Sequence, residues 1–347
     1  MRFPRYSSPH LRPPVTVGGT MRQVGYGLIP GALVLVWAFG WGVVWNLILT
    51  TATAVGTEAL MLRLRRRPVR HFLGDYSAVV TGLLIGLALP PLAPWWLPVV
   101  GTAFAMVFAK HIYGGLGYNP FNPAMVAYVV LLISFPRLMT QWSAPAGIAD
   151  AQLGIWDSLV FTITRELPPE LTLDAITGAT PLDAVRTGLR DARTLPEIRS
   201  VPLFTAFGGQ GWWLANLAFL AGGIYLLVRR IIGWRIPVSL LAGIALPAAI
   251  HWIGDPTTHP GMIFHLFSGA TMIGAFFIAT DPVSAATTPQ GRLVYGAGIG
   301  FLTWLIRTFG GYPDAIAFAV LLMNMTGPLL DHYLRPRVYG HSRGGDQ

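Results

Sequence analysis

The sequence predicts an all-α integral membrane protein of about ten transmembrane helices, arranged as two five-helix inverted repeats with an extracytoplasmic loop subdomain. Three observations support this fold class. Hydrophobic residues make up 53% of the 347 residues and charged residues only 11%. Apolar runs recur in both halves of the chain, and one long polar segment separates the halves. Soluble domains of this length carry far more charge, so we expect lipid around most of the chain.

The individual spans follow from apolar stretches of about 17 to 25 residues, the length that crosses a bilayer as a helix. Several stretches are short or interrupted by Pro and Gly. In chain order, the expected spans are 24–40, 42–62, 76–91, 94–112, 122–136, 211–228, 236–253, 263–280, 293–308 and 315–331.

Basic residues orient these spans, because cytoplasmic loops of membrane proteins are enriched in Lys and Arg. An even number of spans places both termini on one side, and 17 of the 24 Lys and Arg residues fall on that side. Six of the other seven lie in the long segment 137–210, and long loops count little in this rule. We therefore expect a cytoplasmic N-terminal segment, 1–23, and a cytoplasmic tail, 332–347.

The segment 137–210 has a normal density of acidic residues, Asp150 among them, and predicts a small extracytoplasmic subdomain. It separates a first transmembrane half, 24–136, from a second, 211–331. The halves share an order of Thr, apolar helix and Pro in TGLLIGLALPPLAPWW and TMIGAFFIATDPVSAA. Because each half has an odd number of spans, the two repeats would be inverted relative to each other.

Composition also narrows the function. The net charge of +9 comes from short basic clusters between apolar runs, so nucleic acid is not an expected partner. Without cysteine the chain holds no disulfide or iron–sulfur cluster, and any electron must travel on another cofactor. His251, His259 and His265 do not share a helical face, so a polar loop is favoured over a metal site. No residue is assigned a catalytic role.

Two similar turns end in threonine, DAITGATPLDA at 174–184 and HLFSGATMIGA at 265–275. Thr180 precedes Pro181 and an apolar pattern of helical spacing, which predicts a helix N-cap. A phosphate there would meet free backbone N–H groups. A plain helix cap on an exposed loop explains the same residues. Thr271 begins an apolar span, where small residues usually serve close packing.

Longer stretches resemble a known family. DAITGAT fits the flavinylation pattern D-x-x-[ST]-G-A-T, and DYSAVVTGLLIGLALPP, KHIYGGLGYNPFNPAMVAYVVLLISFP and GAFFIATDPVSAATTPQGR are similar to the NqrB/RnfD family. Its members are membrane subunits of the sodium-pumping NADH:quinone oxidoreductase and of the Rnf electron-transport complex. The likeness covers essentially the whole chain, including SPHLRPPVTV near its start.

The resemblance implies that a flavin transferase attaches FMN through its phosphate to the last threonine of the pattern. The pattern needs an acidic residue six positions earlier, which the second turn replaces with His265. The resemblance therefore favours the first turn as the flavin carrier and Thr271 as scaffold. The cofactor-binding residues that it implies are Asp174, Thr177, Gly178, Ala179 and Thr180.

A second, non-covalent flavin, riboflavin, lies near the motif YNPFNPA in the related sodium-pumping complex. The resemblance thus implies Asn119 and Asn122 as its ligands, although amides at a helix break would also satisfy freed backbone groups. Arg186 and Arg190 would either compensate the negative charge of the FMN phosphate or remain solvated. Glu58, Asp75, Asp281 and Asp331 are acidic residues near the bilayer, and each either lies on an ion path or pairs with a nearby cation.

In function, the resemblance implies one component of a multi-subunit ion-translocating oxidoreductase in the bacterial inner membrane. It would relay electrons between ferredoxin- and NAD-linked partners, the other Rnf subunits (A, B, C, E and G), coupled to Na⁺ or H⁺ movement. A urea- or ammonium-type channel, which shares the five-plus-five repeat, is the alternative without flavin. A protein that only scaffolds its neighbours in the complex is a third possibility.

Overall fold

The computed structural model describes residues 16–149, 151–312 and 314–335. Within these ranges, each of the expected spans contains helix. The expected cytoplasmic segments are described only from residue 16 onward and up to residue 335, and the loop residue Asp150 lies outside the described residues.

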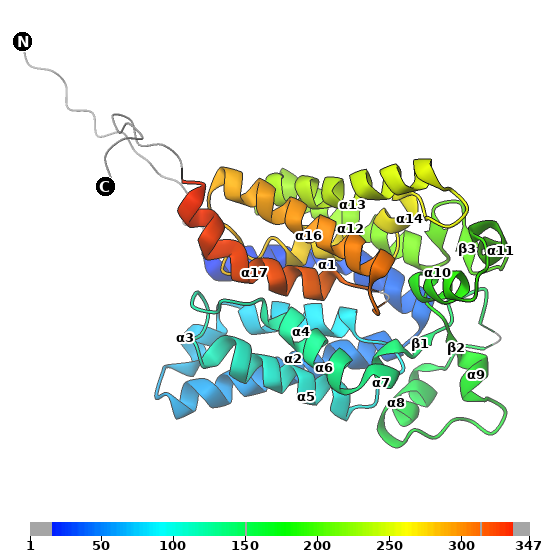
Figure 1. Ribbon diagram of the computed structural model, residues 1–347. Coiled ribbons are helices and arrows are strands. Elements are labelled where there is room, and N and C mark those ends of the chain that lie inside the picture. The colour runs from blue at the N-terminus through cyan, green and yellow to red at the C-terminus, as the bar shows by residue number, and fades with distance from the viewer. Residues whose placement is uncertain (1–15, 150, 313, 336–347) are drawn as a thin grey trace, which may run out of the picture.

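The first half is built from helices joined by short turns (Figure 1). Two long helices come first, and a π-helical turn, η1, extends the helix α5. The elements are α1 (Val17–Phe39), α2 (Gly42–Leu64), α3 (Val69–Leu73), α4 (Ser77–Ala88), α5 (Trp96–Phe104), η1 (Ala105–His111) and α6 (Pro123–Ser134).

The second half has the same character, and a π-helical turn, η2, follows the short helix α15. The expected span 263–280 is broken, because helix stops at Leu266 and restarts at Thr271. The elements are α12 (Trp212–Val228), α13 (Arg235–Gly254), α14 (Met262–Leu266), α15 (Thr271–Ile273), η2 (Gly274–Ile278), α16 (Pro289–Phe309) and α17 (Ile316–Tyr333).

The segment between the halves folds as short helices with two small antiparallel strand pairs, so the all-α expectation misses these strands. Strand β1 pairs with β2, and β3 pairs with β4. The elements are α7 (Pro136–Thr140), β1 (Trp142–Ser143), α8 (Ile155–Thr164), α9 (Leu173–Ile176), β2 (Thr177–Gly178), α10 (Pro181–Arg190), α11 (Leu195–Arg199), β3 (Phe204–Thr205) and β4 (Gly208–Gly209).

One predicted boundary is wrong for a local reason. The first helix begins at Val17, ahead of the expected 24, because Thr16 caps it: the Thr16 hydroxyl accepts a hydrogen bond from the Gly19 N–H at 3.1 Å. Among the described helices, α1, α2 and α13 are long and apolar enough, by length and composition, to cross a membrane.

Figure 1 shows two layers: α2 to α6 form the lower layer, and α12 to α17 form the upper layer together with α1, which packs on α12. The order of packing in the first half recurs in the second. Helix α2 packs on α4 and α5, and α5 packs on α6; likewise α13 packs on η2 and α16, and α16 packs on α17. The pairs α1 with α12 and α6 with α17, which take the same places in the two halves, join one half of the chain to the other.

Glycine lets the paired helices approach closely. A Cβ on Gly222 of α12 would lie only 1.9 Å from the Gly27 carbonyl oxygen of α1. Backbones in such contact exclude any larger side chain, as small residues at membrane helix interfaces generally do. The first pair of helices is thus held together at backbone distance.

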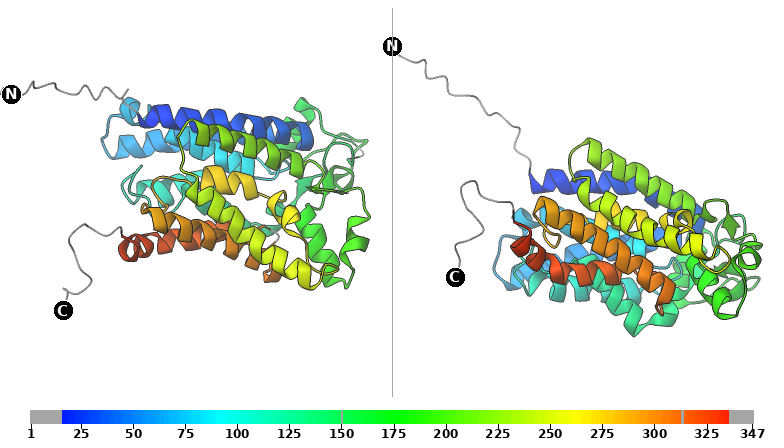
Figure 2. Two further views of the ribbon diagram at one scale, coloured as in Figure 1. Left: turned by 90° about the horizontal axis from the view of Figure 1, so that it is seen from above. Right: turned by 45° about the horizontal axis from the view of Figure 1, so that its top comes forward.

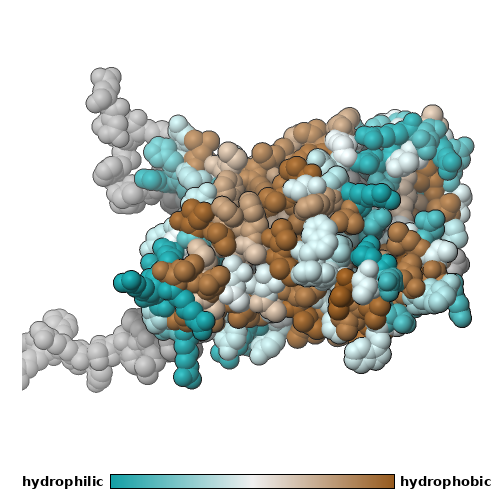
Figure 3. All heavy atoms as spheres, turned by 90° about the horizontal axis from the view of Figure 1, so that it is seen from below, coloured by the Kyte–Doolittle hydropathy of each residue, from teal (hydrophilic) through white to brown (hydrophobic). Residues whose placement is uncertain are grey.

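The bundle has two distinct ends (Figure 2). We call the end that carries segment 137–210 the loop end, and the end with the exposed basic residues near α3 the arginine end. Helix α1 begins and α17 ends at the arginine end. Figure 3 shows hydrophobic surface across the middle of one face and hydrophilic surface concentrated towards the two ends. This distribution is the one expected of a protein with a bilayer around its middle.

Candidate functional site

Thr180 is the N-cap of α10, as the sequence predicts. Its backbone is extended (φ −69°, ψ 154°), its hydroxyl accepts from the Asp183 N–H at 3.2 Å, and Pro181 occupies the first helical position. The Asp183 carboxylate pairs with Arg186 at 3.3 Å. A phosphoester on the Thr180 oxygen would leave that oxygen able to accept, so esterification is compatible with the cap. Pro181 has no N–H, and the Asp183 and Ala184 N–H groups are engaged. The Leu182 N–H and the positive end of the helix dipole are therefore what favour an anion there.

The strand before this cap is fixed by pairing. Gly178 lies opposite Trp142, and Thr177 lies opposite Ser143. A Cβ on Gly178 would lie 3.2 Å from the Cα of Ala144, which is tighter than almost all such contacts. The small residue in the pattern therefore serves the approach of β2 to the chain after β1.

The motif has two faces. Asp174, Thr177, Gly178 and Ala179 line a depression of ≈ 530 Å³ on the outside of the subdomain. Thr180 instead lines an inner cavity of ≈ 1090 Å³, counted with its open mouth. The structure thus brings the first four residues together and turns the threonine towards the bundle.

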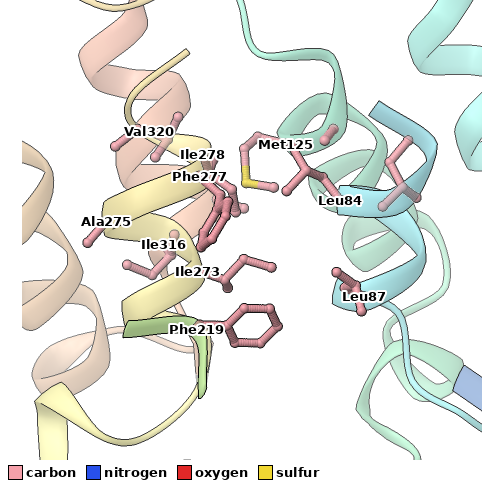
Figure 4. Close-up of a cluster of buried hydrophobic side chains, with 14 of the residues drawn as sticks. Leu84, Leu87, Met125, Phe219, Ile273, Ala275, Phe277, Ile278, Ile316 and Val320 are labelled. Atoms are coloured by element: carbon pink, nitrogen blue, oxygen red, sulfur yellow. The ribbon is translucent and has the colours of Figure 1, made fainter. Parts of the chain in front are cut away.

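The inner cavity lies between the two halves of the bundle. Figure 4 shows part of its walls, with Leu87 and Met125 on one side and Phe219, Ile273 and Ile316 on the other. Two tryptophans, Trp142 and Trp212, also line the cavity. Its polar lining residues include Tyr128, Asn216 and Asp314.

This set of groups fits a flavin. Flat aromatic and apolar walls suit a tricyclic ring, and the Trp142 and Trp212 rings themselves lie 4.6 Å apart in an edge-on arrangement. The attachment hydroxyl and the helix N-terminus suit a phosphodiester. The residues that would hold FMN are therefore Thr180 for the phosphate and the cavity walls for the ring.

The second threonine turn forms the facing wall. Thr271 is fully buried, with its hydroxyl 2.8 Å from the His265 carbonyl oxygen and 2.9 Å from that of Ser268. Arg307 donates to the same hydroxyl at 3.0 Å and pairs with Asp314 at 2.8 Å. This copy is a buried structural turn.

The two similar turns meet in space. Gly269, in the second turn, has φ +59°, and a Cβ there would lie 2.7 Å from Leu182 of α10 and 2.4 Å from the Asp314 carboxylate. Arg186 donates to the Gly311 carbonyl on the same side. Arg186 therefore helps to dock α10 on the second half, whereas Arg190 is exposed.

Sequence reasoning missed Arg307, Asp314 and Asn216 as parts of this site. Arg307 is the one Lys or Arg residue on the loop side of the expected topology that lies outside segment 137–210, and the sequence indicated no other role for it. Asn216 donates to the Gly269 carbonyl at 2.9 Å and accepts from the Met272 N–H at 3.0 Å. For Asn216 and Arg307 the available signal was a polar residue inside an expected apolar span, which usually marks an internal contact, whereas Asp314 lies between two expected spans.

A second cavity, of ≈ 870 Å³ with its open mouth, lies nearer the arginine end and is lined by Asn119, Asn122 and Lys110. Asn122 caps α6, because its side-chain oxygen accepts from the Ala124 N–H at 2.9 Å. Asn119 is buried, and its side-chain oxygen has no hydrogen-bond partner within the described part of the chain. That free acceptor fits a ligand with an N–H or O–H group, as a flavin ring has.

The four acidic residues near the bilayer are engaged locally. Glu58 pairs with Lys110 at 2.9 Å, and the Lys110 ammonium also donates to Ser77 at 2.8 Å. The other three carboxylates accept backbone N–H groups at helix or turn starts. Asp75 accepts from Ser77, Asp281 from Val283, and Asp331 from Thr287 and Thr288.

The histidines divide in space. His251 and His259 lie with ring centroids 4.7 Å apart, while His265 is buried beside Arg307. Over residues 16–149, 151–312 and 314–335, no group of three or more Asp, Glu or His residues is placed to hold a metal ion.

Comparison with known proteins identifies the family. Residues 5–340 match the NQR2, RnfD, RnfE family. The chain is 53% identical over 338 residues to the D subunit of the ion-translocating oxidoreductase complex of Alcanivorax borkumensis, covering 96% of each chain. It is 50% identical over 352 residues to the protein of the same name from Aliivibrio salmonicida, covering 99% of this chain and 100% of the relative. The chain belongs to the NQR2, RnfD, RnfE family of membrane proteins.

Proposed function

We propose that this chain is the D subunit of an ion-translocating oxidoreductase complex and carries FMN covalently on Thr180. The observation that carries the proposal is the place of the Thr180 hydroxyl, at a helix N-terminus and on the wall of an aromatic cavity. Relatives with about half of their residues identical over nearly their full length are named as the D component of such a complex. Bound FMN would accept and release one or two electrons.

The chain's own residues would position the group and exclude water from it. Thr180 and the first turn of α10 would hold the phosphate, and Trp142, Trp212 and Phe219 would cover the ring. The docking of α10 on the turn at Gly269 would fix the attachment point relative to the bundle.

The finer topology belongs to the same proposal. Ten membrane spans in two inverted repeats agree with the recurring packing order of the halves. The excess of Lys and Arg at the arginine end supports cytoplasmic termini and a periplasmic subdomain in the bacterial inner membrane. Electrons would pass to and from the other Rnf subunits (A, B, C, E and G), coupled to Na⁺ or H⁺ movement, and a flavin transferase would attach the FMN.

We further propose a non-covalent riboflavin in the second cavity. Its support is the free side-chain oxygen of Asn119 beside an open space. Asn122 would line the cavity without accepting a hydrogen bond from the ligand, because its side-chain oxygen already caps α6.

The channel alternative has less support. The relatives are named as parts of an oxidoreductase, and the inner cavity carries the threonine of a flavinylation pattern. A channel would bind no covalent flavin.

The test is in-gel flavin fluorescence after denaturation, on full-length chain coexpressed with a flavin transferase. Wild type should fluoresce and Thr180→Val should be dark. Thr288→Val is the matched control, because Thr288 also caps a helix before a proline and accepts from the Gly291 N–H at 3.1 Å. Thr288→Val and Thr271→Val should keep their fluorescence. A dark wild-type band, with the transferase active on a known substrate, would refute the proposal.

A further inference from the structure

Helix α8 stands apart from the bundle core. It has ten residues and is therefore about 15 Å long, which is half the thickness of a bilayer's hydrocarbon core. It cannot cross a membrane, although its sequence IWDSLVFTIT is largely apolar. In Figure 1 it lies at the edge of the molecule, at the loop end.

Its backbone is tied to the ends of the neighbouring helices. The Trp45 indole N–H donates to the Ile155 carbonyl at 3.3 Å, and the Trp95 backbone N–H donates to the Thr162 carbonyl at 2.9 Å. Ser158 and Phe161, with Thr162, form the buried face of the helix. The position of α8 relative to α2 and α5 is thus fixed on one side.

The opposite face is apolar and uncovered by any described residue. Trp156 is 71% exposed, Val160 48% and Ile163 55%. These residues follow the spacing i, i+4 and i+7, so they form one stripe along the helix. Asp157 and Thr164, also exposed, lie along one edge of this stripe. The helix therefore has a protein face, an apolar face and a polar edge.

The surroundings indicate what covers the apolar face. Trp41, before α2, and Trp95, before α5, are both exposed at the same end of the bundle. Exposed tryptophans at one level are typical of the boundary between lipid and water. Beyond them, α2 presents exposed apolar residues such as Ile48. The α8 stripe lies at this same end, since the α8 backbone is hydrogen-bonded to Trp45 and Trp95.

We propose that α8 is an interfacial helix, with Trp156, Val160 and Ile163 inserted into the lipid at the headgroup boundary and Asp157 towards water. A short helix with one apolar face and one polar edge, held beside the ends of longer apolar helices, suits this position. Its role is to anchor the subdomain that carries Thr180 at a fixed height above the bilayer. The inference rests on the membrane location and not on the flavin.

The absence of cysteine gives a direct test, because a single introduced cysteine carries the only thiol. Full-length Val160→Cys, Ile163→Cys and Asp157→Cys variants are spin-labelled in phosphatidylcholine–phosphatidylglycerol nanodiscs. Collision rates with oxygen, which concentrates in lipid, and with a water-soluble nickel chelate then report depth. Ile48→Cys on α2 provides the standard for a label in lipid.

We expect labels at 160 and 163 to collide mainly with oxygen, at depths between those of positions 157 and 48. Mainly nickel collisions at 160 and 163 would place the stripe in water and overturn the proposal. Low collision rates with both reagents would show protein cover, by a second copy of the chain, and would also overturn it. A label at position 48 of the Ile48→Cys variant that collides mainly with oxygen shows that the folded bundle is inserted in the nanodisc.

Discussion

The two threonine turns touch at Gly269, and the backbone conformation of this residue makes it sensitive to substitution. Its φ of +59° lies in the left-handed region, and the space where a Cβ would stand is taken by Leu182 and Asp314. We predict that Gly269→Ala lowers stability by about 1–3 kcal/mol. Thermal unfolding in nanodiscs measures the change.

The control is Gly25→Ala on α1, where a Cβ meets nothing within 4 Å and the helix favours alanine. That variant should match or exceed wild type. An unchanged melting temperature for Gly269→Ala would mean that α10 does not dock on the turn as described.

Asp255, which lies outside the expected spans, makes the stability of the protein depend on pH. Its carboxylate accepts from the Thr257 hydroxyl at 2.6 Å and from the Thr257 N–H at 2.9 Å, and these hydrogen bonds, with one from Thr258, lower the pKa of Asp255 to about 2. Because the folded pKa lies below the ordinary value of about 3.9, this contribution to stability is fully present above pH 4. It is lost as pH falls towards 2.

The expected result is a fall in the melting temperature of wild type between pH 4 and 2 that is smaller in Asp255→Asn. The loop also holds α11, since the Leu195 N–H donates to the Thr257 carbonyl at 2.7 Å. If the melting temperatures of the two proteins fall equally between pH 4 and 2, the Asp255 hydrogen bonds do not contribute to stability.

At the scale of elements, the packing of α13 against α16 depends on close contact between their backbones. A Cβ on Gly300 would lie 2.1 Å from the Leu240 carbonyl oxygen, which cannot move without shifting α13. We predict that Gly300→Ala separates the helices and costs about 1–3 kcal/mol. The melting temperature of the purified chain is the readout.

Gly298, on the same helix, is the matched control. A Cβ there would meet the Met323 side chain, whose flexible end can move aside. Gly298→Ala should therefore cost much less than Gly300→Ala. The reverse order would contradict the described packing of α13 against α16.

At the scale of the whole molecule, the loop end and the arginine end should lie on opposite sides of the membrane. Glu170 and Arg67 are exposed at these two ends. In intact cells, a membrane-impermeant maleimide should label Glu170→Cys and leave Arg67→Cys unlabelled until the membrane is opened. Labelling of both in intact cells, or of Arg67→Cys alone, would contradict the proposed orientation.

Much of this architecture was predictable because the physical constraint is local. Lipid requires long apolar helices, so each of the ten expected ranges contains helix, and Thr16 explains the early start of α1. The Thr180–Pro181 pair likewise predicted its cap, since capping depends on neighbours within one turn. The break within 263–280 escaped prediction because side chains from other helices impose it: Asn216 and Arg307 take up the backbone groups that the turn leaves free.

The sequence by itself determined the lipid environment, the helical ranges, the cap at Thr180 and the family resemblance, because each depends on composition or on residues close in the chain. Only the tertiary structure decided that Thr180 faces an inner cavity while Asp174 faces outward. It also placed the second threonine turn, held by Arg307 and Asp314, against α10. These contacts join residues far apart in the chain, and no local propensity specifies which distant surfaces meet.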